Sequence, residues 1–454
     1  MREMKTDLDL NPLNKAFENT LPFQKIGKIH SNKGMVYEIS LPQAIIGSRV
    51  EFVTDYGPKC FGEVIALRGK KCLAMPYEEI SGLNSETKVY LRDLTTEIQI
   101  SDSMLGRVLD FQGRPLDNKG ELLGSFETRS IYGTPINPLD RPPINSAITT
   151  GIHSIDFFMT AGQGQRLAIM SGSGVGKSVL LGMMARFTNA DVSVIALVGE
   201  RGREVLEFIE RDLGPEGLKR SVVVVATSDC SPLIRMKAAY TATTIAEYFR
   251  DKNNHVMFMM DSITRFAMAN REISLAAGEP PGQKGYTPTV FSRLPKLLER
   301  AGTKRGSGTI TGMYTVLVEG GDMDEPIADA IRAIADGHII LTRELAQKNY
   351  FPAVDILSSI SRVMNQVVKA DHKALASRLR DLLAAYKDSI DLINVGAYVR
   401  GANPKVDLAI ELIDSFETLM KQDLEERTSV SISELYDQLE QIILIAEKKL
   451  TSSE

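Results

Sequence analysis

The sequence predicts an α/β protein built from an N-terminal β-barrel, a central parallel-sheet domain and a C-terminal helical domain. Three observations support this prediction. Short alternating segments with intervening glycines fill residues 21–100, apolar strand-like segments alternate with helical ones over residues 101–370, and a helical pattern continues through residues 371–454. A chain of 454 residues is also too long for a single hydrophobic core.

The composition is that of an ordinary soluble protein, with 43% apolar and 24% charged residues. The net charge of −5 provides no basic footprint, so nucleic acid is not an expected partner. The three cysteines, Cys60, Cys72 and Cys230, have no metal-binding spacing and fit a reducing compartment. The N-terminus MREMKTDLDL lacks the apolar core of a signal peptide, and no apolar stretch reaches the about 18 residues of a membrane span. We therefore expect a cytoplasmic protein whose contact with a membrane is peripheral.

Residues 1–20 form a short polar segment ahead of the barrel. Leu10, Leu13 and Phe17 would share one face of a helix. The segment is either a frayed end or a docking helix for a partner, and the sequence leaves both interpretations open.

The barrel is predicted from the alternating segments VYEISL (36–41) and KVYLRDL (88–94), with glycines marking the turns between strands. Beyond it, GRVLD (106–110) is echoed by GRPLD (113–117). Because this pair does not recur, it predicts a hairpin-like turn and not a repeat array. The stretch TPINPLDRPP (134–143) contains four prolines, which favour an extended connector at a domain boundary.

Six strand-like segments follow the connector, and helical segments such as 178–188 and 237–252 lie between the earlier ones. Continuous apolar strands that alternate with helices favour a parallel sheet covered on both faces. The predicted strands are QRLAIM (165–170), SVIALVG (193–199), SVVVVAT (221–227), HVMFMMD (255–261), TITGMYTVLV (309–318) and HIILT (338–342).

The C-terminal region has a helical pattern. Apolar residues recur at spacings of three and four, and they would form one face of a helix. Ser431 and Glu434 form a capping box ahead of a last amphipathic helix. We expect a packed helical domain without a ligand site. The residues of the apolar face are Val406, Ile410, Ile413, Phe416 and Met420.

The most informative motif is SGSGVGKS (171–178), between the strand QRLAIM and an apolar helical segment. Strand, glycine-rich loop, Lys-Ser and helix in this order are the context of a P-loop, whose backbone N–H groups and helix dipole hold phosphate oxygens. Lys177 would contact the outer phosphates, and the Ser178 hydroxyl suits a Mg²⁺ ligand. Ser171 stands where the pattern has its first glycine, a position that shapes only the entry of the loop. The candidate nucleotide-binding residues here are Ser171, Gly172, Ser173, Gly174, Val175, Gly176, Lys177, Ser178 and Val179.

Two carboxylates follow predicted strands and would lie at the same sheet edge as the P-loop. Asp261 ends HVMFMMD, where it can hold a water of the Mg²⁺ shell. Glu200 ends the strand SVIALVG within VGERGRE, where it can orient and polarise an attacking water. Alone, the GERGRE stretch would be interpreted as a solvated run of charge, and the P-loop upstream favours the catalytic interpretation.

These motifs together resemble the catalytic core of rotary ATP synthase heads. Three longer stretches resemble the flagellar and type III secretion export ATPases: GEPPGQKGYTPTVFSRLPKLLERAG (278–302), NYFPAVDILSSISR (349–362) and GAYVRGANPKVDLAIEL (396–412). The resemblance covers roughly residues 20–450. It implies a RecA-like fold for the P-loop domain and hydrolysis of ATP with Mg²⁺.

The resemblance also implies roles for individual residues. Glu200 would be the catalytic carboxylate, with Arg201 bracing the site and Asp261 as the Walker B acid. Arg265 would lie near the γ-phosphate. Within the stretch 349–362, Phe351 would pack on the adenine and Arg362 would be an arginine finger that reaches a neighbouring copy. Because one chain carries both Glu200 and Arg362, identical copies could complete each other's sites, which predicts a homohexamer.

Further partners are implied by the same resemblance. They are a stator-like regulatory protein at the N-terminus, a central stalk protein, export chaperones with their substrates, and an export gate at the membrane. A rotary synthase subunit is the main alternative, but the stretch 377–398 lacks the acidic run typical of that subunit. A translocase that acts on nucleic acid is disfavoured by the excess of acidic residues and by the lack of a basic, aromatic-rich stripe. A non-catalytic nucleotide-binding scaffold is disfavoured by Glu200, because such a protein does not need a carboxylate that activates water. The motifs do not separate a flagellar from a virulence-type system.

Overall fold

The computed structural model describes residues 26–54, 59–80, 82–84, 86–318, 322, 325–423 and 430–451. These fall into two compact units, one of residues 26–96 with 276–278 and one of residues 97–275 with 279–451. The predicted docking segment 1–20 lies outside the described residues. Among the residues that the structure describes, every helix is too short or too polar to span a membrane.

The first unit is a closed six-stranded antiparallel barrel with strand order β1-β2-β5-β4-β3-β6. Its alternating strands place one set of side chains inside, so the barrel core contains Ile39, Val50, Phe52, Val64 and Val89. The predicted barrel is therefore confirmed. Its strands are β1 (Ile26–Lys33), β2 (Val36–Ser40), β3 (Arg49–Val53), β4 (Cys60–Arg68), β5 (Lys71–Pro76) and β6 (Lys88–Asp93).

The second unit is centred on a nine-stranded sheet with the order β19-β18-β12-β17-β15-β13-β14-β8, and β16 pairs with β17. The strands from β18 to β8 in this order run parallel, while β19 and β16 are antiparallel to their neighbours. The predicted parallel sheet is confirmed. Its strands are β8 (Arg107–Leu109), β12 (Arg166–Ser171), β13 (Val192–Val198), β14 (Ser221–Ala226), β15 (His255–Asp261), β16 (Gly302–Thr303), β17 (Thr309–Leu317), β18 (Gly337–Leu341) and β19 (Ile360–Ser361).

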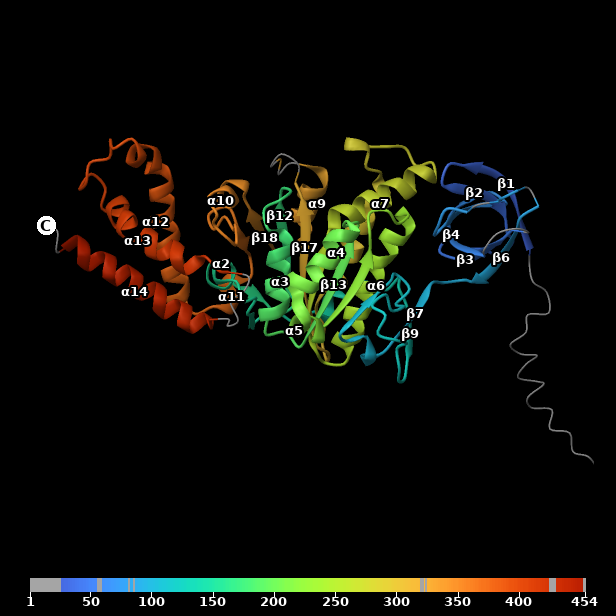
Figure 1. Ribbon diagram of the computed structural model, residues 1–454, viewed down its shortest axis with the longest axis horizontal. Coiled ribbons are helices and arrows are strands. Elements are labelled where there is room, and N and C mark those ends of the chain that lie inside the picture. The colour runs from blue at the N-terminus through green and yellow to red at the C-terminus, as the bar shows by residue number, and fades with distance from the viewer. Residues whose placement is uncertain are drawn as a thin grey trace, which may run out of the picture. The chain divides into compact units, whose positions relative to one another are not determined.

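Helices cover this sheet (Figure 1). Helix α6 packs on β13, β14 and β15, and α9 packs on β12 and β17. Strand β13 is buried along its whole length, as a parallel strand between two covered faces should be. The helices of this region are α2 (His153–Phe158), α3 (Lys177–Phe187), α4 (Gly202–Glu207), a π-helical segment (Phe208–Leu213), α5 (Gly214–Lys219), α6 (Pro232–Asp251), α7 (Ile263–Ala276), α8 (Pro288–Leu298), α9 (Pro326–Ile334), α10 (Arg343–Gln347) and α11 (Met364–Val367).

The hairpin-like turn predicted from GRVLD (106–110) and GRPLD (113–117) is present next to the sheet. Asp110 donates its backbone N–H to Arg114, which closes the predicted hairpin-like turn. Strands β7 (Glu97–Ile100) and β9 (Glu127–Ser130) pair with each other, as do β10 (Ala147–Ile148) and β11 (Ala161–Gly162). The proline-rich connector 134–143 lies inside the second unit, because the two units divide between residues 96 and 97.

Three long helices complete the chain: α12 (Ala370–Asn394), α13 (Pro404–Met420) and α14 (Ile432–Thr451). The predicted capping box at the start of α14 is confirmed, since Ser431 and Glu434 exchange side-chain to backbone hydrogen bonds. On α13, Phe416 and Met420 are buried, whereas Ile410 and Ile413 are only partly buried. The helices share one continuous hydrophobic core with the sheet, so they pack on the second unit as part of one body.

Candidate functional site

The glycine-rich loop connects β12 to α3 at the carboxyl end of the sheet. Gly174 and Gly176 have φ angles of 77° and 84°, a left-handed conformation that favours glycine. Gly176 is the N-cap of α3 and provides no side-chain cap. The first backbone N–H groups of α3 are therefore available to an anion at the positive end of the helix dipole.

The other predicted residues of the loop lie at the end of β12, in the turn or in the first turn of α3. Ser173 is exposed, Lys177 begins α3, and Ser178 and Val179 follow in its first turn. Ser171 is not part of the turn, because it is the last residue of β12 and pairs in register with β17 and β18. Its substitution for glycine therefore leaves the phosphate-facing turn unchanged.

Lys177 is the centre of a buried charge cluster. Its Nζ lies 2.5 Å from Asp261 Oδ1 and 3.7 Å from Glu200 Oε1. Burial disfavours the ammonium, but the two carboxylates outweigh that cost, and the pKa of Lys177 is raised. The lysine is thus held as a cation at the base of the loop.

Asp261 is buried at the end of β15 and has a second partner on the adjacent strand. The Thr315 hydroxyl donates a hydrogen bond of 2.8 Å to Asp261 Oδ1. Thr315 is fully buried in β17, so its hydroxyl has no access to solvent and holds the carboxylate in place. Thr315 was not among the residues predicted from the sequence. It is one of three threonines in β17, so the sequence of that strand does not distinguish it.

Glu200 follows β13 after Gly199, and its side chain is 17% exposed. Burial, and then the negative charge of Asp261, raise the pKa of Glu200 to about 7 against the opposing effect of Lys177. Its Oε1 atom is buried and accepts no hydrogen bond from the described part of the chain. A carboxylate with a pKa near neutrality, whose buried Oε1 has an ion pair with Lys177 but accepts no hydrogen bond, is suited to accept a proton from water.

The two arginines predicted next to these acids have different environments. Arg265 on α7 packs against Gly199, where a methyl group would lie 2.9 Å from Arg265 Cβ, and its charge acts on Lys177. Arg201 is 81% exposed and pairs with Glu204 at 2.9 Å. The structure therefore brings Arg265 into the cluster and leaves Arg201 outside it.

Phe351 and Arg362 lie at different edges of the sheet. A methyl group on Gly176 would lie 3.4 Å from the Phe351 ring, so this aromatic side chain lies over the loop. Arg362 is exposed and follows β19, which pairs with the amino end of β18. The loop, Glu200 and Asp261 are at the carboxyl ends of the strands, so Arg362 is not part of the same cluster.

The donor set around the loop fits a Mg²⁺ ion that keeps most of its waters. No group of three or more His, Cys, Asp or Glu side chains in the described ranges could hold a metal on its own. Mg²⁺ in nucleotide sites instead takes one or two protein oxygens together with phosphate oxygens and waters. The Ser178 hydroxyl and the Asp261 carboxylate are hard oxygen donors of that kind.

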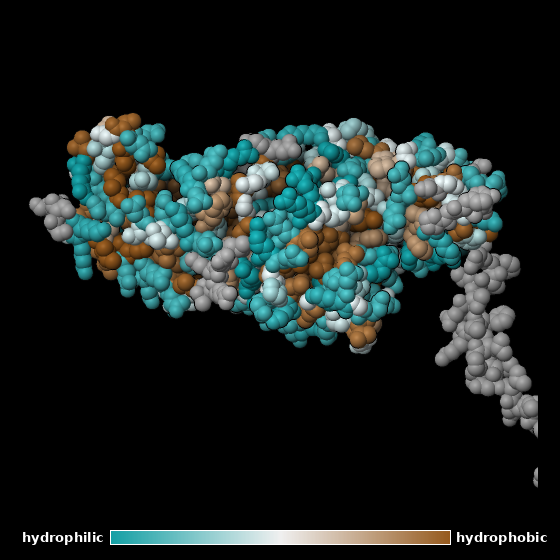
Figure 2. Space-filling model, viewed as in Figure 1, coloured by the Kyte–Doolittle hydropathy of each residue, from teal (hydrophilic) through white to brown (hydrophobic). Residues whose placement is uncertain are grey.

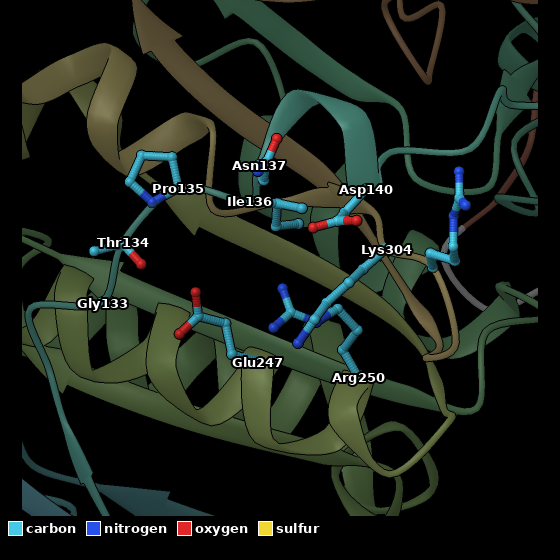
Figure 3. A pocket seen from close by; sticks show the side chains of 10 residues that line it. Gly133, Thr134, Pro135, Ile136, Asn137, Asp140, Glu247, Arg250 and Lys304 are labelled. Carbon is cyan, nitrogen blue, oxygen red and sulfur yellow. The ribbon is translucent and has the colours of Figure 1, made fainter.

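A separate cleft of about 620 Å³ lies between the proline-rich connector and α6 (Figure 3). Charged side chains of both signs line it, including Asp140, Glu247, Arg250 and Lys304. Arg250 is near the end of α6, just before β15, and Lys304 precedes β17. The cleft is therefore at the amino ends of the strands, away from the glycine-rich loop at their carboxyl ends.

Known protein families match both the central sheet domain and the C-terminal helices. The family model for the nucleotide-binding domain of the ATP synthase alpha/beta family matches residues 151–361, and the model for the T3SS EscN ATPase C-terminal domain matches residues 368–441. The flagellum-specific ATP synthase of Bacillus subtilis is 50% identical over 413 residues, which cover 90% of this chain and 94% of the relative. The chain belongs to the family of flagellar and type III secretion ATPases.

Other members of the flagellar and type III secretion ATPases agree with this assignment. The type 3 secretion system ATPase of Xanthomonas euvesicatoria is 45% identical over 404 residues, which cover 89% of this chain and 91% of the relative. A solved structure of assembled EscN from enteropathogenic E. coli has a TM-score of 0.86 at 42% identity and covers 92% of this chain and 100% of its own. The chain is therefore an ATPase, and the rotary synthase alternative is not supported.

Proposed function

We propose that this chain hydrolyses ATP with Mg²⁺ in a ring of identical copies, and that the ring energises protein export through a flagellar-type secretion apparatus. One observation carries the proposal. The groups for phosphate binding and water activation gather at the carboxyl edge of the sheet, while Arg362 lies toward the opposite edge. A complete site then requires two copies.

The chemistry follows from the cluster at the P-loop. The loop N–H groups and Lys177 bind the β- and γ-phosphates. Glu200 takes a proton from a water as its oxygen attacks the γ-phosphorus in line, and the bond to the ADP oxygen breaks. Arg265 offsets charge that develops on the γ-phosphate. Mg²⁺, held by Ser178 and by Asp261 through water, would neutralise charge on the β- and γ-oxygens.

The distance along β18 supports a role for Arg362 in a neighbouring copy. Ser361 is in register with Gly337 at the amino end of β18, and Ser171 is in register with Leu341 at its carboxyl end. Four residues of parallel strand span about 13 Å. This separation is longer than an arginine side chain, so Arg362 does not reach the P-loop of its own chain. Its exposed position leaves it available to the next copy.

The test is a complementation experiment with two variants. Glu200→Gln should bind ATP but lose turnover, and Arg362→Ala should lose turnover because its finger is missing. Mixed together, the two variants form interfaces in which an intact Glu200 faces an intact Arg362, so hydrolysis should return in part. Each variant incubated alone at the same total concentration is the control. Absence of any recovery at every mixing ratio would contradict the assignment in trans.

Partners are proposed on the same basis. EscN has been solved in complex with its central stalk EscO, and we propose that a stalk protein also acts on this chain. The turn between α12 and α13 exposes Leu392, Val395 and Val399, and brown side chains gather at this turn in Figure 2. Exposed apolar patches of this kind mark protein interfaces. The stator-like regulator, export chaperones with their substrates and the membrane export gate remain proposals from the resemblance.

The flagellar system is proposed over a virulence system because several relatives at 45 to 50% identity are flagellum-specific. Loss of this chain should then abolish flagellar filaments. Intact filaments in a deletion strain, together with loss of another secreted set of proteins, would favour the virulence-type alternative.

A further inference from the structure

The main chain at Phe351, whose ring lies over the P-loop, is held by a residue that follows α13. Phe351 is 38% exposed, so burial alone does not determine the position of its ring. Its main-chain carbonyl accepts a hydrogen bond of 2.9 Å from the backbone N–H of Gln422, two residues beyond the end of α13. The segment that carries Phe351 is thus tied to a part of the chain some 70 residues away.

The neighbouring pair strengthens this contact. The Lys421 ammonium lies 5.3 Å from the centre of the Tyr350 ring, within the range of a cation–π interaction. Tyr350 is itself buried. Two consecutive residues after α13 therefore hold two consecutive residues at the wall of the nucleotide site.

The Gln422 side chain determines where this contact is made. It is buried, and both ends of its amide are used. Its Oε1 accepts a hydrogen bond of 2.8 Å from the backbone N–H of His153, and its Nε2 donates one of 2.9 Å to the carbonyl of Gly151. His153 is the first residue of α2, whose N-cap residue provides no side-chain hydrogen bond. Gln422 therefore caps α2 from a distant part of the sequence.

The segment that Gln422 binds also contacts the helix of the P-loop. A methyl group on Gly151 would lie 2.2 Å from Phe187 Cβ, so Gly151 packs directly on the last residue of α3. Helix α3 begins at Lys177. The Gln422 side chain is fixed to the segment that packs on α3, and the Gln422 backbone is hydrogen-bonded to Phe351. Gln422 therefore fixes the position of Phe351 relative to α3, the helix that follows the phosphate loop.

We propose that Gln422 is a positioning residue for the base-facing ring of Phe351, so that the end of α13 takes part in nucleotide affinity. This inference rests on the proposed role of Phe351. Loss of the Gln422 amide would free the end of α13 and let Phe351 move away from the base. The phosphate loop keeps its own strand and helix, so contacts to the phosphates would be unchanged.

The test replaces Gln422 by methionine, which keeps the length of the side chain and removes both hydrogen bonds. We expect the KM for ATP to rise about three- to tenfold, the range of one or two neutral hydrogen bonds, with kcat changed less than twofold. Inorganic tripolyphosphate, which has no base, should inhibit the variant and the parent protein with the same constant. If Gln422→Met does not fold, Gln422→Glu retains the acceptor for His153 and should show the same direction of change.

The matched control is His372→Ala. His372 is equally buried, and its Nε2 lies 2.8 Å from the carbonyl of Phe157 at the other end of α2. This variant also weakens the junction between α2 and the C-terminal helices, but the hydrogen-bond and ring partners of His372 are Phe157 and Tyr436, away from the Gln422 contact. It should lower the melting temperature without raising the KM for ATP.

The outcomes separate the two proposals. If Phe351→Ala leaves the KM for ATP unchanged, the proposed role of Phe351 fails. If Phe351→Ala raises the KM but Gln422→Met does not, only the positioning role of Gln422 is refuted. In the double variant Phe351→Ala with Gln422→Met, the KM for ATP should rise little more than in Phe351→Ala alone. If the fold-increase in KM equals the product of the two single fold-increases, the residues act independently, and the positioning role of Gln422 is refuted. An equal loss of tripolyphosphate binding would show that Gln422 acts on the phosphate loop instead.

Discussion

The burial of Glu200 beside Asp261 predicts that Glu200→Gln makes the nucleotide-free protein more stable. The pKa of Glu200 is raised from an ordinary 4.5 to about 7, so the folded state favours the protonated carboxyl group. Between these two values the folded protein binds more protons than the unfolded chain. Stability from this group is therefore complete below pH 4.5 and is lost as the pH rises through 7. Glutamine has the shape of the protonated acid and avoids this loss.

The expected size follows from the two pKa values. The free energy of unfolding that is lost, relative to low pH, is about 3 kcal/mol at pH 8 and about 1.4 kcal/mol at pH 5.5. The Glu200 side chain is 17% exposed, so solvent screening reduces these figures only modestly. The same carboxylate serves the proposed reaction, so Glu200→Gln should lose ATP hydrolysis while its free energy of unfolding rises.

Thermal unfolding of the nucleotide-free protein provides the assay. For a unit of about 350 residues, about 3 kcal/mol corresponds to roughly 4 °C in Tm. We expect Glu200→Gln to melt higher than the parent protein at pH 8 and the gap to shrink by about half at pH 5.5. Glu216→Gln is the control, because Glu216 is exposed in an ion pair with Lys219 and should have little effect at either pH. A gap that does not depend on pH, or a less stable variant at pH 8, would refute the argument.

Three further predictions follow from single contacts at the site and at the partner surface. Thr315→Val removes the 2.8 Å hydrogen bond to Asp261 without changing the packing volume, so the free energy of unfolding should fall by about 1.5–3 kcal/mol in urea denaturation; an unchanged midpoint would contradict this. Gly176→Ala places a methyl group against Phe351 at a left-handed φ of 84°, which costs about 1–3 kcal/mol, and nucleotide titration should show weaker ATP binding in a folded protein. Val395→Asp at the exposed α12–α13 turn should weaken binding of a stalk protein in a pull-down without lowering Tm; normal binding would place the stalk surface elsewhere.

Features that depend on neighbouring residues were predicted correctly. The six central strands occur within about two residues of the predicted bounds, because apolar runs between turn signals are a local property. The turn 171–178 was recognised because its glycines, Lys177 and the following helix are adjacent in the chain. The capping box at Ser431 was also found from a three-residue spacing.

Features that join distant segments were not predictable in the same way. The strand order places β17 between β12 and β15, although β17 follows both in the chain. That order brings Thr315 next to Asp261. Arg201 is exposed and pairs with Glu204, a contact that the motif does not predict. Its assignment to the site stays a prediction.

The sequence by itself determined the types of the elements, and it singled out the glycine-rich turn with Lys177, Glu200 and Asp261 as candidates, because each is encoded by local periodicity or by a short motif. Only the tertiary structure decided which of these groups meet, what raises the pKa of Glu200, and that Gln422 holds the chain at Phe351. The physical reason is that burial and electrostatic coupling depend on distances between segments far apart in the chain, and no local pattern records those distances.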